Sequence, residues 1–212
     1  MWRAATVGAT TIVARPTIEL QGEGLPMFNS YRLVTTLLSA AFASPAFAYS
    51  TTGYKLNSQI WYQASEVFTG TTREGFRSAM STWNQLLPSN KRLCYDQTTH
   101  DLRFYPNNDS LNRIYKTYSG SNRYLAENSV WYNTSTRYVS ESDVDINANY
   151  SWWNGAEPGR YDVQSVFLHE MGHSVGLSHS TQPVAVMYST MSTNMVKRIL
   201  QADDINGVKS LY

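Results

Sequence analysis

Residues 166–179 read VFLHEMGHSVGLSH, and this stretch decides how the rest of the chain is interpreted. His169 and His173 are four residues apart, so a helix places both imidazoles on one face. Gly176 lets the chain leave that helix through a backbone conformation that is costly for other residues. His179 can then return as a third ligand, so the stretch predicts a three-histidine metal site.

The three histidines indicate a catalytic metal rather than a structural one. Three neutral imidazoles leave one tetrahedral position for water, which is the pattern of a catalytic zinc. Glu170 directly follows the first ligand and is expected to bind that water, take its proton and pass it to a leaving amine. The short pattern H-E-x-x-H also arises by chance, but three of the four histidines of this chain lie within these residues. The fourth, His100, is interpreted as a surface or turn residue.

Composition limits the class of protein. The chain has 212 residues, is 42% hydrophobic and carries a formal net charge of +1, which predicts one globular domain with a sizeable core. The absence of a basic block argues against nucleic-acid binding, and no apolar run is long enough to span a membrane. The single cysteine, Cys94, excludes an intramolecular disulfide and is interpreted as a small buried hydrophobe. We expect a monomer.

The N-terminal part is typical of an export signal. Arg32 precedes an apolar run that ends in Ala46-Phe47-Ala48, which is a small-residue cleavage site. We therefore predict a signal peptide at 27–48, a secreted protein and a mature chain that begins at Tyr49. Residues 1–26 could come from a start codon chosen too early. The alternative interpretation of the apolar run is a buried helix of the fold.

The remaining chain predicts an α+β domain at 49–212. A T-x-x-E capping box at Thr71 and Glu74 predicts a helix over 72–87 that ends at Pro88. Its buried face is formed by apolar residues at helical spacing, namely Phe76, Met80, Trp83 and Leu87. Aromatic and polar runs between about 59 and 150 are typical of strands and turns. Further helices are expected from near Asp162 and from Gln201 to Tyr212.

One of these strands has a mixed pattern. Val144 and Ile146 alternate with the polar residues Asp143, Asp145 and Asn147. This alternation predicts a half-buried or edge strand.

Several segments of the chain resemble a known family. The span from His169 to His179 is similar to the long zinc signature of the metzincin metallopeptidases. Val186-Met187-Tyr188 resembles their Met-turn, in which a methionine underlies the three ligand rings. Ser180 and the ending at 200–212 resemble the matrixin branch. The resemblance is strong over 163–212 and fainter over 72–87 and 143–150.

The resemblance implies a fold and a cleft. The expected domain has a twisted, mostly parallel sheet with an antiparallel edge strand, two long helices and a small C-terminal subdomain with a third helix. A peptide substrate would pair with the edge strand, for which Val144 and Ile146 are the candidates. Tyr188 and the residues after it would line the pocket for the side chain that follows the scissile bond.

The resemblance implies one catalytic zinc. The structural zinc of animal matrixins needs further histidines, so we do not expect it here. Calcium is without support, because acidic residues such as Asp143, Asp145 and Glu157 are more often simply solvated.

The sequence therefore predicts a secreted zinc endopeptidase that acts on proteins or peptides. One rival is a non-catalytic zinc-binding or adhesive module on the same fold, against which the presence of Glu170 argues. A second rival is a zinc enzyme with a non-peptide substrate.

Asp203 and Asp204 allow two interpretations. Both stand in the first turn of the expected third helix, where acidic residues are favoured by the positive end of the helix dipole. Capping of that helix is the simpler interpretation. By resemblance to matrixins, the free ammonium of Tyr49 in a processed chain would instead pair with an aspartate here.

Overall fold

A mixed sheet carries the helices that position the site. The computed structural model describes residues 3–5, 48–101, 106–118 and 124–212. The predicted signal peptide at 27–48 lies almost wholly outside these residues and stays a prediction. Among the described residues, no helix is both long and apolar enough to cross a membrane.

The large sheet has the strand order β1-β5-β6-β4-β2-β3. Its strands are β1 (Arg3–Ala5), β2 (Ile60–Ser65), β3 (Leu93–His100), β4 (Asn112–Thr117), β5 (Ala126–Tyr132) and β6 (Val139–Asn147). The pairs of β2 with β3, β2 with β4 and β4 with β6 are parallel, whereas β5 is antiparallel to both β6 and β1. A parallel pair of short strands, β7 (Trp152–Trp153) and β8 (Tyr161–Asp162), precedes the second helix. The predicted α+β class is confirmed.

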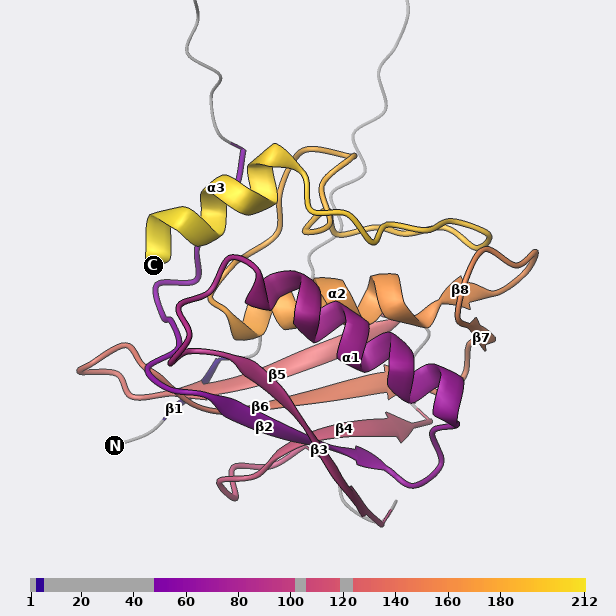
Figure 1. Cartoon of the computed structure of the whole chain (residues 1–212), viewed down its shortest axis with the longest axis horizontal. Helices are drawn as coiled ribbons and strands as arrows, with labels where there is room; N and C mark the ends of the chain where they lie inside the picture. The colour runs from indigo at the N-terminus through magenta and orange to yellow at the C-terminus, as the bar shows by residue number, and fades with distance from the viewer. Residues whose placement is uncertain (1–2, 6–47, 102–105, 119–123) are drawn as a thin grey trace, which may run out of the picture. The chain divides into compact units, whose positions relative to one another are not determined.

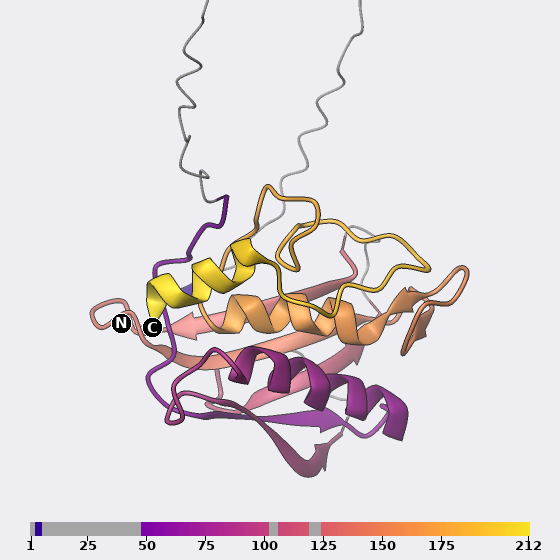
Figure 2. The same ribbon diagram turned by 45° about the horizontal axis from the view of Figure 1, so that its top comes forward.

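Helices α1 (Gly70–Asn84) and α2 (Val163–Ser174) lie side by side on one face of the sheet (Figures 1 and 2). Their aromatic side chains pack together, and the ring centroids of Phe76 and Phe167 are 4.5 Å apart. The buried indole of Trp83 on α1 donates a hydrogen bond of 2.7 Å to the backbone oxygen of Leu168 on α2. These contacts fix the helix that carries the first two histidines.

The predicted limits of α1 are wrong, although its buried face is confirmed. The helix begins at Gly70 because the backbone oxygen of Thr69 accepts the first helical hydrogen bond, from the nitrogen of Arg73. Thr71 therefore lies inside the helix and forms no capping box. The helix ends at Asn84, whose side-chain amide bonds both backbone groups of Leu93 at the start of β3.

The other two helices lie where the sequence predicts them. The carboxylate of Asp162 caps α2 by accepting a hydrogen bond of 3.1 Å from the backbone nitrogen of Ser165. Helix α3 (Ala202–Leu211) starts with a capping box in which Gln201 and Asp204 bond each other's backbone nitrogens. The cap is therefore made by Asp204, and Asp203 is free for another role.

The prediction of an edge strand at Val144 and Ile146 is wrong. Strand β6 lies inside the sheet, between β5 and β4, and both side chains are buried under the helices. A peptide cannot pair with a strand that already has two neighbours. The antiparallel strand next to the edge is β5.

Three further interpretations change, each of which concerns individual side chains. Cys94 is half-buried and not a core residue. Asp143 and Asp145 are buried rather than solvated, and they accept hydrogen bonds from the backbone nitrogens of Arg113 and Thr117. His100 is the last residue of β3, and its ring nitrogens contact the backbone oxygens of Asp101 and Ile114.

Candidate metal centre and active site

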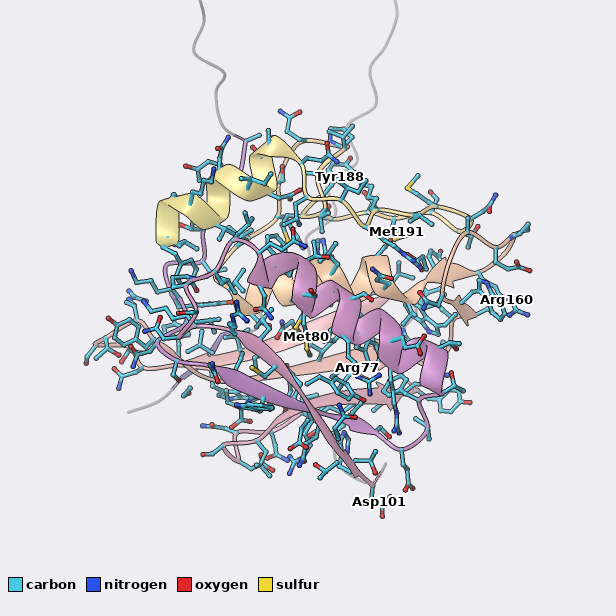
Figure 3. All side chains as sticks on the ribbon, in the orientation of Figure 1. Arg77, Met80, Asp101, Arg160, Tyr188 and Met191 are labelled. Atoms are coloured by element: carbon cyan, nitrogen blue, oxygen red, sulfur yellow. The ribbon has the colours of Figure 1, made fainter. Side chains whose placement is uncertain are left out.

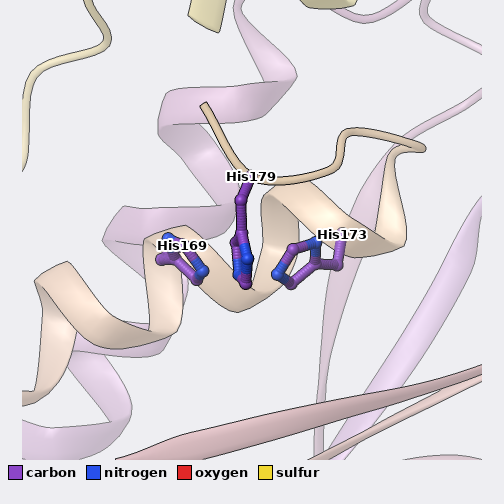
Figure 4. A group of neighbouring side chains, drawn as sticks. All are labelled: His169, His173 and His179. Carbon is purple, nitrogen blue, oxygen red and sulfur yellow. The ribbon is translucent and has the colours of Figure 1, made fainter. Parts of the chain in front are cut away.

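Three histidine side chains converge at the C-terminal part of α2 (Figure 4). His169 and His173 project from the helix, and His179 reaches back from the segment that follows it. The chain reverses at Gly176, which has a φ of +103° and whose Cβ, if present, would collide with the backbone oxygen of Tyr54. The reversal therefore needs glycine for both conformation and space.

The spacing of the three rings fits a single metal ion. Their centroids are 4.9 to 5.1 Å apart, and one potential ligand atom from each lies within 4.8 Å of the other two. Among the described residues this is the only group of three or more His, Cys, Asp or Glu side chains with that property. The group could hold a metal ion.

Hydrogen bonds to two of the histidine rings determine which ring nitrogen is available to bind a metal ion. Nδ1 of His169 lies 2.8 Å from the backbone oxygen of Val186, and Nδ1 of His173 lies 2.8 Å from that of Leu177. A carbonyl oxygen only accepts, so in both neutral rings Nδ1 carries the proton. Nε2 is then left with the lone pair that a metal requires, and the ring orientation is fixed from outside.

Burial keeps the three rings neutral. It lowers the pKa of His169 well below its ordinary value and that of His173 to about 4, and it lowers the pKa of His179 as well. Desolvation is the largest cause in each case, because it disfavours the charged imidazolium. The triad therefore offers lone pairs over a wide range of pH.

Met187 packs directly against Gly172 of this helix. It is buried, and a Cβ on Gly172 would collide with its sulfur atom. The methionine is held in place through its backbone, because the carboxylate of Asp204 accepts hydrogen bonds from the nitrogens of Val186 (2.9 Å) and Met187 (3.0 Å). The capping residue of α3 thus also shapes the turn under the site.

Glu170 directly follows His169 on α2, and its side chain is buried. Desolvation, with a smaller contribution from Glu127 on β5, raises the pKa of its carboxyl group to about 8. The backbone oxygen of Glu170 accepts a hydrogen bond of 2.5 Å from the side-chain amide of Asn128, also on β5. A cation near the carboxyl group would lower this pKa, since it favours the charged form.

A buried polar network that the sequence did not predict fixes α2 on the sheet. The amide of Asn128 also donates to Ser174 Oγ at 2.8 Å, and Ser174 Oγ accepts from the hydroxyl of Tyr62 at 2.9 Å. Ser142 completes the network by donating to Asn128 Oδ1 at 2.8 Å. These residues lie far apart in the sequence, so only the strand order reveals that they meet.

Asp203 connects the start of the domain to the site. Its Oδ1 accepts hydrogen bonds of 2.9 Å from the backbone nitrogens of both Ala48 and Tyr49. Its Oδ2 accepts a hydrogen bond of 2.6 Å from the hydroxyl of Ser180, the residue after the third histidine. Tyr49 thus lies beside an aspartate, and that aspartate is not the one that caps α3.

Comparison with known proteins identifies related sequences. Residues 49–212 match the family model described as matrixin, Peptidase_M10. Metalloendoproteinase 1-MMP of Arabidopsis thaliana is 30% identical over 142 residues, which are 65% of this chain and 36% of that protein. Metalloendoproteinase 4-MMP of the same plant is 47% identical over 51 residues, which are 24% of this chain and 15% of that protein.

A human protein matches over a short region. Neutrophil collagenase of Homo sapiens is 35% identical over 71 residues, which are 33% of this chain and 15% of that protein. In these comparisons the chain therefore spans between 15% and 36% of the length of its relatives.

Proposed function

Because this chain belongs to the matrixin family, we propose that it is a zinc-dependent endopeptidase that cleaves protein or peptide substrates. The observation that carries the proposal is the convergence of three neutral imidazoles, whose candidate ligand atoms lie within 4.8 Å of one another, together with the buried carboxyl group of Glu170, the residue after the first of them. A set of three nitrogen donors fits a catalytic zinc.

His169, His173 and His179 would hold the metal through Nε2, and Met187 would support their rings from below. A zinc ion in this position would supply Lewis acidity to a water molecule and to the scissile carbonyl group. The carboxylate of Glu170 would take a proton from the attacking water and give it to the leaving amine. The pKa of Glu170, raised to about 8 by burial and lowered again by a nearby cation, suits both steps near neutral pH.

The substrate backbone would pair with β5. Residues 126–129 of this strand have β6 as their only strand neighbour among the described residues, whereas β1 covers 130–132. This part of β5 lies beside the helix, because Asn128 bonds the backbone of Glu170. An extended peptide could add here as a further antiparallel strand. Tyr188 would lie beside the side chain that follows the scissile bond.

We further propose that the mature enzyme is secreted after cleavage behind Ala48 and acts as a monomer. The support is the apolar run with its small-residue ending and the family match that starts at residue 49. N-terminal sequencing of the exported protein would detect Tyr49 as the first residue. Intact residues 27–48 on exported protein would contradict the processing step.

The decisive test is cleavage of a peptide library by the zinc-loaded protein, read by mass spectrometry. We expect internal cleavage that a zinc chelator abolishes and that added zinc restores. The matched control is Glu170→Ala protein of equal zinc content, which removes contaminating peptidases as an explanation. A zinc-loaded, folded protein that cleaves no peptide would overturn the proposal.

A further inference from the structure

Two adjacent cations fix the segment 189–200, which follows the Met-turn and contains no helix or strand. Arg198 forms hydrogen bonds of 2.5 and 2.8 Å to the carboxylate of Asp162, the N-cap of α2. The backbone nitrogen of Lys197 donates to Ser165 Oγ in the first turn of α2 at 2.7 Å. Lys197 is thus anchored to the helix that carries His169.

The ammonium group of Lys197 lies next to the turn that supports the site. Its Nζ is 2.7 Å from the backbone oxygen of Pro183 and 3.4 Å from that of Ala185. The next carbonyl along the chain, that of Val186, accepts the hydrogen bond from Nδ1 of His169. The carbonyl groups of two consecutive residues, Ala185 and Val186, therefore accept hydrogen bonds from the Lys197 ammonium group and from the candidate metal ligand His169. Lys197 is accordingly one of the minor causes that lower the pKa of His169, after burial, His173 and His179.

The same ammonium group faces the residue expected to contact the substrate. Nζ of Lys197 lies 5.1 Å from the centroid of the Tyr188 ring. Figure 3 places Tyr188 and Met191 on the side of α2 that faces away from the sheet.

No carboxylate neutralises Lys197 directly. Among the described residues, no Asp or Glu oxygen lies within 4 Å of its Nζ. Asp162 is paired with Arg198, and Asp204 is bound to three backbone nitrogens, although its charge opposes the lowering of the Lys197 pKa by burial. An ammonium group has three N–H donors, and two of them point to carbonyl oxygens here. One donor and the positive charge remain for a ligand.

We propose that Lys197 makes the enzyme selective for substrates with a carboxylate side chain, Glu or Asp, directly after the scissile bond. The inference rests on the proposed endopeptidase function and names its substrate class. A carboxylate that enters beside Tyr188 would meet the Lys197 ammonium and complete its hydrogen bonds. A neutral side chain of equal size would leave the charge half-solvated. Charge, rather than size alone, then decides preference at this position.

The test uses three peptides built on one sequence that the library shows to be cleaved. They differ only in the residue after the scissile bond, which is Glu, Gln or Leu. We expect kcat/KM for the Glu peptide to exceed that for the isosteric Gln peptide by about tenfold or more. The ratio should fall as salt is added, because salt screens the attraction between partly exposed charges. Equal values for Glu and Gln in the unmodified enzyme would overturn the inference.

Three variants separate charge from shape. Lys197→Met keeps the length of the side chain and should bring the Glu-to-Gln ratio close to one while the Leu peptide is still cleaved. Lys197→Arg should keep most of the preference. Lys209→Met removes an exposed charge on α3 and should leave the ratio unchanged. An unchanged ratio in Lys197→Met would contradict the role of Lys197.

The outcomes also separate this inference from the proposed function. If the enzyme cleaves peptides without preferring Glu over Gln, the proposed endopeptidase function stands and the proposed selectivity is refuted. If the protein cleaves no library peptide, the proposed endopeptidase function itself is refuted. If Lys197→Met does not fold, the ratio and its salt dependence in the unmodified enzyme still decide.

Discussion

Helix α2 and the segment 180–200 both shape the metal centre, but they obtain their geometry in different ways. In α2 the backbone repeat alone sets two histidines on one face. The segment has no helix or strand, and distant side chains hold it in place. Asp204 binds the backbone of Val186 and Met187, and Arg198 binds Asp162. The helix carries two of the three candidate ligands, whereas the segment supplies the support for the rings and the charge beside them.

The two regions depend on each other. The carbonyl oxygen of Val186 accepts the hydrogen bond that orients His169, and Met187 occupies the space above Gly172. A substitution in the helix should therefore mainly lower the rate of peptide hydrolysis. A substitution that releases the segment should mainly lower stability and metal affinity. The first two predictions below test this division, and the other two test the protonation of the histidines and the start of the domain.

The largest effect is expected in the helix. Glu170→Ala should lower kcat by at least about 10²-fold, because a positioned general base contributes about 10²–10⁴-fold. Folding should be retained, since the contact of Asn128 uses the backbone oxygen of Glu170 and not its side chain. Peptide turnover, zinc content and thermal unfolding should be measured on the same preparation, with Glu170→Gln as the near-isosteric companion. Near-normal turnover would refute the assigned role.

For the support of the segment, Asp204→Asn on α3 should destabilise the fold by about 1.5–3 kcal/mol, because a buried charged acceptor is lost. The carboxylate accepts from three backbone nitrogens, and an amide would turn a donor toward at least one of them. Urea unfolding of the zinc-free protein measures this. The matched control is Asp203→Asn, at a half-buried site, for which we expect a smaller loss. Equal losses in the two variants would contradict the special role of Asp204.

The zinc affinity should change little with mild acidification. Three imidazoles with the ordinary pKa of about 6.5 would lose about fifty-fold in affinity between pH 7.5 and 6, because protons compete with the metal. Here burial lowers all three pKa values, that of His173 to about 4, so competition starts at lower pH. We expect less than about a tenfold loss over that range, measured with a competing chelator. A fifty-fold loss would show that the rings are not protected by burial.

The smallest effect concerns the start of the domain. Cleavage before Tyr49 would place an ammonium group where a backbone nitrogen now lies 2.9 Å from Asp203 Oδ1. A half-exposed ion pair is worth only about 0–1 kcal/mol. Protein that starts at Tyr49 should thus unfold at slightly higher denaturant than protein with a few extra residues, and Asp203→Asn should remove the difference. A larger benefit that persists in Asp203→Asn would require another partner.

Much of the helix and of the ligand set could be predicted from the sequence. The distance between His169 and His173, and the need for Gly176, follow from helix periodicity and backbone sterics. The predicted C-terminal limit of α1 was wrong because the side chain of its last residue, Asn84, forms hydrogen bonds with the start of β3. The predicted edge position of Val144 was wrong because one alternating pattern is shared by an edge strand and by an inner strand whose acidic residues are covered by the loop before β4.

The supporting residues could not be predicted, because their partners are remote in the chain. Asn128 meets Ser174 across 46 residues, and Arg198 meets Asp162 across 36. No local periodicity encodes such pairs; they follow from strand order and from the path of an irregular segment. A signal was present for Asp203 and Asp204, whose place in a first helical turn is favoured electrostatically, but it did not indicate which groups they bind.

The most direct test of the metal centre is a crystal structure of the mature protein with diffraction recorded on both sides of the zinc absorption edge. We expect one anomalous peak per chain, bound by Nε2 of His169, His173 and His179, while each Nδ1 of the two helical histidines keeps its backbone partner. A peak at any other group, or a zinc-supplemented crystal in which the three imidazoles bind no metal, would contradict the central claim.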